Sequence, residues 1–342
     1  MCPWFIGDLD EAQEALEEEL DVLTNITDIF GQVLKISTSA STGPFVQDGQ
    51  VIRVYLEKFV VPAYLPYLVT ANTTPSSVQT SLKVMSTCLV DDILEFSLLN
   101  SPSPNPLDAL PSVRSNFSQI VQTLLTNCSS EHLLLKQCSS YGVVQLLQHH
   151  SWFIQENPSL ISNILAVLMA ILQHPEAKSD ECEGITENAV YCIGMLVTNY
   201  SALLLGSPQT SCQYNGLVAA FLQALPLGAD DVEFHGSTAL LGQLLERVDN
   251  NVLGENFTNV PLILKTIAQL LYTHHAQTAK QVITPTTNVL LLEPDTCTVL
   301  LQCNYTRLTA VLSQYSKLIP PQVMQSAVSA LPATHQKVLS NA

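Results

Sequence analysis

Apolar residues recur at the spacing of an α-helix in one segment after another along this chain. The segments run for about 12 to 25 residues, and short clusters of Pro, Ser and Gly separate them. Helices are predicted over residues 8–36, 51–69, 81–99, 115–127, 131–150, 160–173, 185–200, 216–225, 231–248, 259–275 and 297–318. The 342 residues include only 13 glycines and 6% aromatic residues, so few tight turns and few strands are expected. The predicted fold class is all-α.

Two kinds of helix alternate along the chain. Segment 160–173 is apolar throughout and is expected to be buried on most faces. Segment 185–200 carries small and polar residues, and is expected to be half core and half exposed surface. Small residues let helices approach closely, and those with this expected role are Ala189, Cys192 and Gly194, together with Cys138, Ser139, Ser140 and Gly142.

The spacing of the helices favours a repeat architecture. Small-residue helices recur roughly every 45 to 55 residues, against about 40 to 47 for HEAT-type helix pairs. The sequence therefore predicts an α-α superhelix, an armadillo-like HEAT-repeat solenoid of about six antiparallel pairs with a right-handed twist. No shift in composition marks a domain boundary, so residues 1–342 are expected to form one continuous array. Pro62 and Pro66 are expected to bend or break the helix over 51–69.

The charge balance limits the class of partner. The chain has 13 Lys and Arg against 30 Asp and Glu, a formal net charge of −17. Such a chain repels a phosphate backbone, so nucleic acid is not expected as a direct partner. Basic protein segments are the expected partners, although the alternative that the charge serves only solubility stays open.

Cysteine usage and hydropathy bear on the compartment. The nine cysteines include no CxxC pair, and we expect buried free thiols in a reducing compartment. Seven N-x-S/T sequons would be glycosylation acceptors in a secreted protein, but the first residues show no basic and apolar signal-peptide pattern. The most apolar run, 160–173, is too short for a bilayer, so no membrane insertion is expected.

The chain carries no recognisable catalytic motif. It has no GxSxG elbow, no dinucleotide or P-loop glycine motif and no HExxH pair. Asp91, Asp92 and Glu95 lie close enough on one helix to suggest a metal or acid–base cluster, but no other element supplies further ligands in an obvious pattern. The preferred interpretation is a solvated or partner-facing acidic stripe. We therefore expect no enzyme activity, no cofactor and no metal.

Five stretches resemble one protein family. "ITENAVYCIGMLVTNY" (185–200) resembles the inner helix of a C-terminal HEAT repeat of the importin-β (karyopherin-β) superfamily, in its importin-five branch. Four more stretches resemble the same branch in the same order: "CLVDDILEFS" (88–97), "LKQCSSYGVVQLLQHH" (135–150), "FLQALPLGADDVEF" (221–234) and "VLGENFTNVPLIL" (252–264). Lys136 stands where the repeat usually carries arginine, and residues 277–294 lengthen a connection beyond the family's pattern.

The resemblance implies a function. It covers essentially the whole chain and corresponds to the C-terminal third of a longer nuclear import receptor. Such a segment is expected to bind basic cargo proteins and nucleoporins in the cytoplasm, the nucleus and the nuclear pore. The small GTPase Ran would bind mainly through N-terminal repeats that this chain does not include. The alternative is a HEAT-repeat scaffold or adaptor outside nuclear transport.

The expected cargo site is an acidic concave surface. In a HEAT superhelix the second helix of each pair lines that surface, and here those helices carry acidic positions. The candidate partner-binding residues are Asp91, Asp92, Glu95, Glu187, Asn188, Asp231 and Glu233. Exposed carboxylates of this kind would pair with Lys and Arg of the cargo. An alternative stays open for Glu187, Asp231 and Glu233, because carboxylates are also favoured near helix N-termini for capping and dipole reasons.

Overall fold

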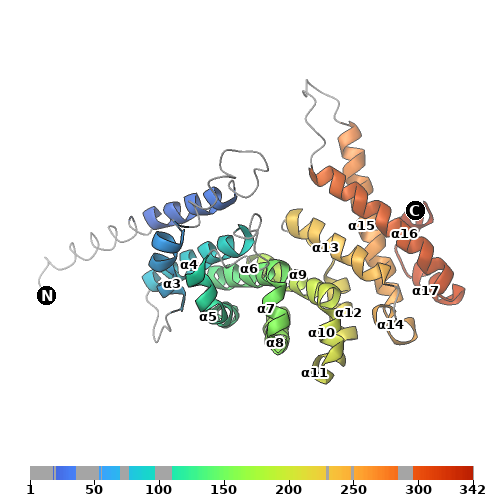
Figure 1. Cartoon of the computed structure of the whole chain (residues 1–342). Helices are drawn as coiled ribbons and strands as arrows, with labels where there is room; N and C mark the ends of the chain where they lie inside the picture. The colour runs from blue at the N-terminus through green and yellow to red at the C-terminus, as the bar shows by residue number, and fades with distance from the viewer. Residues whose placement is uncertain are drawn as a thin grey trace, which may run out of the picture. The chain divides into compact units, whose positions relative to one another are not determined.

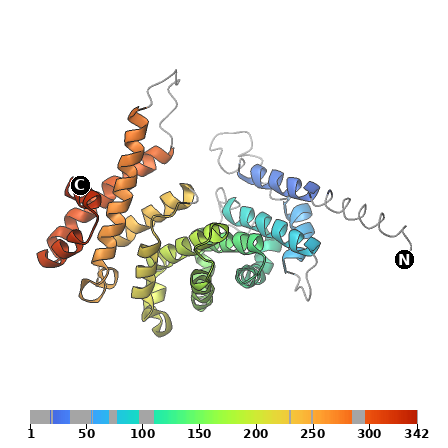
Figure 2. The same ribbon diagram turned by 180° about the vertical axis from the view of Figure 1, so that it is seen from behind.

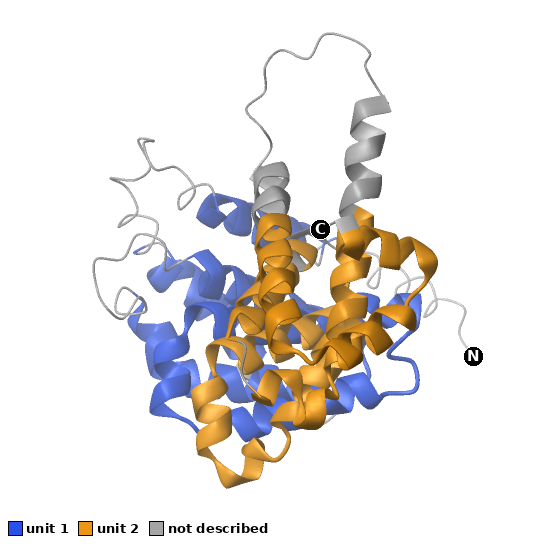
Figure 3. Cartoon of the chain, turned by 90° about the vertical axis from the view of Figure 1, so that its right-hand side faces the viewer, with its two compact units in different colours: residues 1–185 blue, residues 186–342 orange. Residues whose placement is uncertain are grey.

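The chain is all-α. The computed structural model describes residues 18, 21–35, 54, 56–69, 77–96, 110–228, 231–247, 250–283 and 296–341, and no strand occurs among them. This confirms the predicted fold class (Figure 1). The chain divides into two compact units, residues 1–185 and 186–342, which Figure 3 colours separately.

Unit 1 holds a helix over residues 21–35 and the elements η1 to α8. Their bounds are η1 (Leu56–Val60, a π-helical turn), α3 (Val61–Val69), α4 (Ser77–Phe96), α5 (Pro111–Asn127), α6 (Leu133–His149), α7 (Ser151–Glu156), α8 (Leu160–Gln173) and η3 (Asp180–Cys182). The division between the units falls inside α9 (Glu183–Asn199).

Unit 2 continues from α9 to the C-terminal helices. Its further elements are α10 (Ser201–Gly206), α11 (Pro208–Ser211), α12 (Tyr214–Ala224), α13 (Asp231–Glu246), α14 (Asn250–Leu253), η4 (Glu255–Phe257), α15 (Val260–Ile283), α16 (Thr296–Leu318), α17 (Pro321–Ser329) and α18 (Ala333–Asn341). Most of the predicted helices recur within a few residues of their expected bounds. Residues 8–17 of the first predicted helix lie outside the described residues, and α15 ends at Ile283, beyond the expected residue 275. The short helices α7, α10, α11 and α14 and the C-terminal helices α17 and α18 were not indicated by the sequence pattern. Of the unusual connection 277–294, the part up to Ile283 extends α15, and residues 284–294 lie outside the described residues.

The two prolines of the second predicted helix do not break it. The backbone stays helical from Leu56 to Val69, with Pro66 inside α3. The change that does occur is at the start, where the first turn is π-helical and passes into α3 just before Pro62. Pro66 has no backbone N–H, so α3 lacks one hydrogen bond within the helix at this position.

Unit 1 consists of two layers of helices. One layer contains α3, α5 and α8, which contact one another in that order, and the other contains α4 packed on α6. Between the layers α3 contacts α4, and α5 contacts α6. Both opposite views show α4 and α6 side by side (Figure 1 and, from behind, Figure 2). Successive helices thus alternate between two layers, which is the packing expected of α-α repeats.

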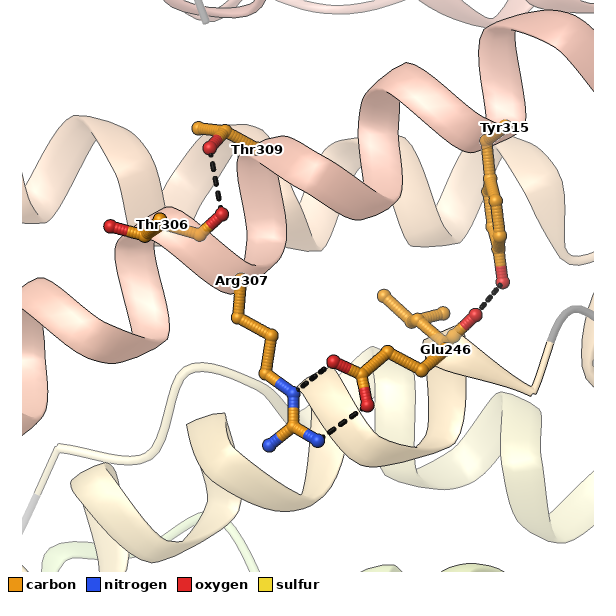
Figure 4. A network of polar contacts seen from close by, with 6 residues as sticks. Glu246, Thr306, Arg307, Thr309 and Tyr315 are labelled. Carbon is orange, nitrogen blue, oxygen red and sulfur yellow. Dashed lines mark hydrogen bonds and ion pairs between the residues drawn. The ribbon is translucent and has the colours of Figure 1, made fainter.

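Unit 2 has the same kind of packing. Helix α12 contacts α15, which in turn contacts α17 and α18, while α13 contacts α16. Polar contacts join α13 to α16, as Figure 4 shows: the Arg307 guanidinium pairs with the Glu246 carboxylate, and the Tyr315 hydroxyl donates to the carbonyl of Leu245 at 3.0 Å. The predicted right-handed superhelix of the whole chain stays a prediction.

The burial of two helices differs from the expectation. Helix α9 was expected to be half exposed, but from Ile185 onward its only exposed residue is Asn199, so that prediction is wrong. Helix α8, expected to be buried on most faces, instead buries one stripe, formed by Leu160, Ile161, Ile164, Leu165, Leu168 and Ile171. The hydroxyl groups that made α9 look half exposed have internal partners: Thr198 donates to the carbonyl of Gly194, for example.

The small residues do allow close approach, as predicted. Ala189, Cys192, Ser139 and Ser140 have no exposed surface. A Cβ atom added at Gly194 would lie 2.8 Å from Cζ of Phe221 on α12.

Among the described residues, no helix is both long enough and apolar enough to cross a membrane.

Candidate partner-binding site

The three carboxylates of α4 lie in three different environments. Asp91 is buried with 4% of its surface exposed, whereas Asp92 and Glu95 are half-buried. Asp92 points about 100° away from Asp91 around the helix axis, and Glu95 lies between these two directions. The acidic stripe expected from the sequence is therefore divided between the core and the surface.

Asp91 faces the adjacent helix α6. Its Oδ1 atom lies against Gly142, where a Cβ atom would collide with it and would also lie 3.0 Å from both methyl groups of Leu124. This Oδ1 atom is buried and accepts no hydrogen bond. Burial raises the pKa of the Asp91 carboxyl well above its usual range, and the nearby charges of Cys88, Asp92 and Glu95 raise it further. The sequence placed Asp91 on a partner-facing surface; that placement is wrong, because α6 covers it.

Asp92 faces the helix over residues 21–35. One of its carboxylate oxygens packs against Gly31, a position at which a Cβ atom would not fit. The pKa of Asp92 is raised to about 6, first by burial and then by the negative charges of Glu95 and Asp28, while Lys35 lowers it. Asp92 therefore belongs to a group of like charges contributed by two helices.

Glu95 stands beside Asp92 near the end of α4. The hydroxyl of Tyr141 on α6 donates a hydrogen bond of 2.8 Å to its Oε2 atom, which fixes the position of the carboxylate. We call the half-exposed group formed by Asp28, Asp92 and Glu95 the acidic patch. Asp28 is exposed, so a partner can reach the patch from the side of the helix over 21–35.

Glu187 and Asn188 are internal residues of α9. Only 8% and 5% of their surfaces are exposed. The Oε1 atom of Glu187 accepts a hydrogen bond of 2.6 Å from the backbone N–H of Gly228, in the turn that precedes α13. The expected role in contacting a partner is therefore wrong for both positions in this structure. This hydrogen bond instead ties the carboxylate of Glu187 to the turn between α12 and α13.

Asp231 and Glu233 occupy the first turn of α13, as the capping alternative requires. Their side chains lie outside the described residues. Both possibilities, partner binding and stabilisation of the helix N-terminus, stay predictions.

Sequence reasoning missed the contributions of Asp28, Lys35 and Tyr141. Asp28 and Lys35 lie on the helix over 21–35, and Tyr141 is on α6, so each is remote in sequence from α4. No local pattern connects these residues to Asp92, since only tertiary packing brings them together. Tyr141 lies in the stretch 135–150, which was quoted for its family resemblance and not for a contact of this tyrosine.

Within the described residues, no group of three or more His, Cys, Asp or Glu side chains is arranged to hold a metal ion. Comparison of the sequence with protein-family models and with curated proteins found no match to either.

Proposed function

We propose that this chain is a segment of a nuclear import receptor that binds basic cargo proteins, with the acidic patch as the point of contact in unit 1. The proposal is supported by the resemblance of the five sequence stretches, by the net charge of −17 and by the two-layer helical packing within each unit. Helical repeats of this kind present extended surfaces to protein partners.

The observation that carries the proposal is the grouping of Asp28, Asp92 and Glu95 from two adjacent helices, which the raised pKa of Asp92 reflects. A carboxyl group whose pKa is raised to about 6 partly by Glu95 and Asp28 lies in a negative local field. A lysine or arginine of a partner would relieve the repulsion among these three carboxylates. Basic segments are therefore favoured over neutral or acidic ones at this surface.

The proposed contact set is smaller than the sequence indicated. It contains Asp92, Glu95 and Asp28, which solvent reaches. Asp91, Glu187 and Asn188 are left out because they are buried, and Asp231 and Glu233 stay predicted contacts of unit 2.

The test is a binding titration with the full chain. A lysine-rich peptide carrying a fluorophore is titrated by anisotropy at low and at moderate ionic strength. Replacing Asp92 and Glu95 together by Ser should weaken binding by about two- to thirty-fold at low salt, since each exposed ion pair contributes roughly 0.2 to 1 kcal/mol. The difference should shrink as salt rises, because exposed charges are screened.

The matched control replaces two carboxylates of equal charge elsewhere in unit 1. Glu131 and Glu176 are exposed, and replacing both by Ser changes the net charge by the same amount. This control should keep most of the affinity. Equal losses in the two double variants would show that only net charge matters and would remove the acidic patch from the proposal.

A second experiment separates transport from general scaffolding. The immobilised chain is offered a nucleoporin fragment and, separately, Ran loaded with GTP. Retention of the nucleoporin fragment supports the transport receptor, even if Ran requires repeats outside this chain. A chain that binds the basic peptide but neither nucleoporin nor Ran is the HEAT-repeat scaffold of the alternative.

A further inference from the structure

Two cysteine side chains from different helices meet between α4 and α6. The Sγ atoms of Cys88 on α4 and Cys138 on α6 are 3.3 Å apart, although the residues are 50 positions apart in sequence. Both are free thiols, and neither residue is fully buried. A disulfide bond is about 2.05 Å long, so the sulfurs need to approach by only about 1 Å.

The surrounding contacts hold the two helices in this register. The Tyr141 hydroxyl on α6 donates to Glu95 on α4 at 2.8 Å. At the end of α6, Nε2 of His150 lies 3.1 Å from the carbonyl oxygen of Leu94, and His150 has no exposed surface. Burial lowers the pKa of His150 to about 4, so the ring is neutral at pH 7 and donates from Nε2 to the carbonyl. Cys88 and Cys138 therefore lie on two helices that are joined to each other by polar contacts C-terminal to both cysteines.

We propose that Cys88 and Cys138 are a redox modification site, at which a low-molecular-weight disulfide such as glutathione disulfide oxidises the two thiols to a reversible bond between α4 and α6. In the first step Cys138 gives up its proton and attacks one sulfur of glutathione disulfide, which releases one glutathione thiol. In the second step Cys88 gives up its proton and attacks the sulfur of Cys138, which releases the second glutathione. Two protein thiols are oxidised, and one glutathione disulfide is reduced to two glutathione thiols.

The surroundings of Cys88 disfavour it as the thiol that attacks first. Its hydrogen bond with Cys138 raises its pKa most, followed by burial and by the negative charges of Cys138, Asp92 and Asp28. A thiol with a raised pKa forms little of the thiolate that attacks a disulfide. Once Cys138 carries glutathione, its thiol proton and its charge are gone, and with them the largest cause of the raised pKa.

The test uses the full chain in defined mixtures of oxidised and reduced glutathione. Remaining thiols are blocked with an alkylating reagent, and peptides are mapped by mass spectrometry without reduction. We expect a Cys88–Cys138 peptide pair, loss of two alkylatable thiols and recovery of both after dithiothreitol. The oxidised chain should also melt higher by on the order of 5 °C, because a cross-link closing a long loop restricts the unfolded chain.

Variants separate the steps. In Cys88→Ser, glutathione should stay on Cys138 as a stable mixed disulfide, while Cys212→Ser, at an exposed cysteine outside the pair, should form the Cys88–Cys138 bond normally. Circular dichroism of each variant checks that it remains folded. Wild-type chain that keeps both thiols alkylatable in the oxidising mixture would overturn the proposal. So would glutathione retained on Cys138 in the wild type, or disulfides that only join two chains.

Discussion

At the scale of single residues, Asp91 shows how a carboxylate can be part of a helix interface. It lies in the middle of α4, with 4% of its surface exposed and its Oδ1 atom without a hydrogen bond. Leaving a buried charge in such a place is costly, so the neutral acid is the favoured form. The residue therefore contributes to packing against α6, and its charge is a liability to the folded state.

This makes a prediction for Asp91→Asn. Burial raises the pKa of Asp91 in the folded chain above the unfolded value of about 4, so between these two pKa values the folded state binds more protons than the unfolded state. This residue's contribution to the free energy of unfolding consequently falls as pH rises above about 4, until the raised pKa is passed. Asparagine cannot ionise, so the variant should gain on the wild type by about 1 kcal/mol or more between pH 5 and pH 8.

Urea unfolding followed by circular dichroism at the two pH values measures this gain. Glu131→Gln is the control, because Glu131 is exposed. Its stability should follow that of the wild type at both pH values. If the free energy of unfolding of Asp91→Asn changed between pH 5 and pH 8 by the same amount as that of the wild type, Asp91 would be charged in the folded chain over this range.

At the scale of elements, the contact between α4 and α6 depends on the absence of a side chain at Gly142. A Cβ atom there would collide with Asp91 and lie 3.0 Å from the methyl groups of Leu124. That distance is shorter than an ordinary contact between carbon atoms, so the buried side chains of Asp91 and Leu124, or the helices that carry them, would have to shift. Gly216 in α12 is a useful comparison, since nothing lies within 4 Å of a Cβ atom added at that position.

Alanine substitution should therefore have opposite effects at the two glycines. Gly142→Ala should lower the free energy of unfolding by about 1–3 kcal/mol through overpacking. Gly216→Ala should raise it by about 0.5–1 kcal/mol, because alanine loses less backbone entropy than glycine in a helix. The measurement is the denaturant concentration at the midpoint of unfolding, compared between each variant and the wild type. A stabilising Gly142→Ala would mean that α4 and α6 are less tightly packed than described.

At the scale of the whole molecule, each unit has its own core and its own polar contacts. In unit 2, Tyr315 has no exposed surface, and its hydroxyl donates to the carbonyl of Leu245 in the last turn of α13. Carbonyls at the end of a helix have no intrahelical donor, so this tyrosine supplies the missing one. In unit 1, the close contact of Gly142 with Asp91 is the place where a substitution should disturb the packing in the same way.

Hydrogen exchange of the full chain should locate the effect of each change. Tyr315→Phe is expected to cost about 1–3 kcal/mol by leaving a buried carbonyl without a donor, and the loss of protection should be largest in α13 and α16. Gly142→Ala should lower protection mainly in α4 and α6. Tyr272→Phe is the matched control, because the Tyr272 side chain is 46% exposed, and it should change little. A uniform loss over both units from either substitution would show a single cooperative unit.

The all-α class and most helix bounds could be predicted from the sequence. They follow from local physics: apolar residues at helical spacing and breakers between them decide where a helix can form. The small residues of α6 and α9 were also identified correctly, because only small side chains permit the close approach seen at Gly142 and Gly194. The net charge and the acidic character of α4 were equally visible in the sequence.

Tertiary structure alone decided which faces are covered and which charges meet. Hydropathy predicted a more deeply buried α8 and a half-exposed α9, but burial depends on how many helices surround an element, and α9 is the more enclosed of the two. The same reason divides the α4 carboxylates, since α6 covers Asp91 while Asp92 and Glu95 reach solvent. Asp28 joins Asp92, and Cys138 meets Cys88, across long stretches of intervening chain. Spacing along one helix fixes directions around its own axis, whereas contacts between helices far apart in sequence are fixed only when the chain packs.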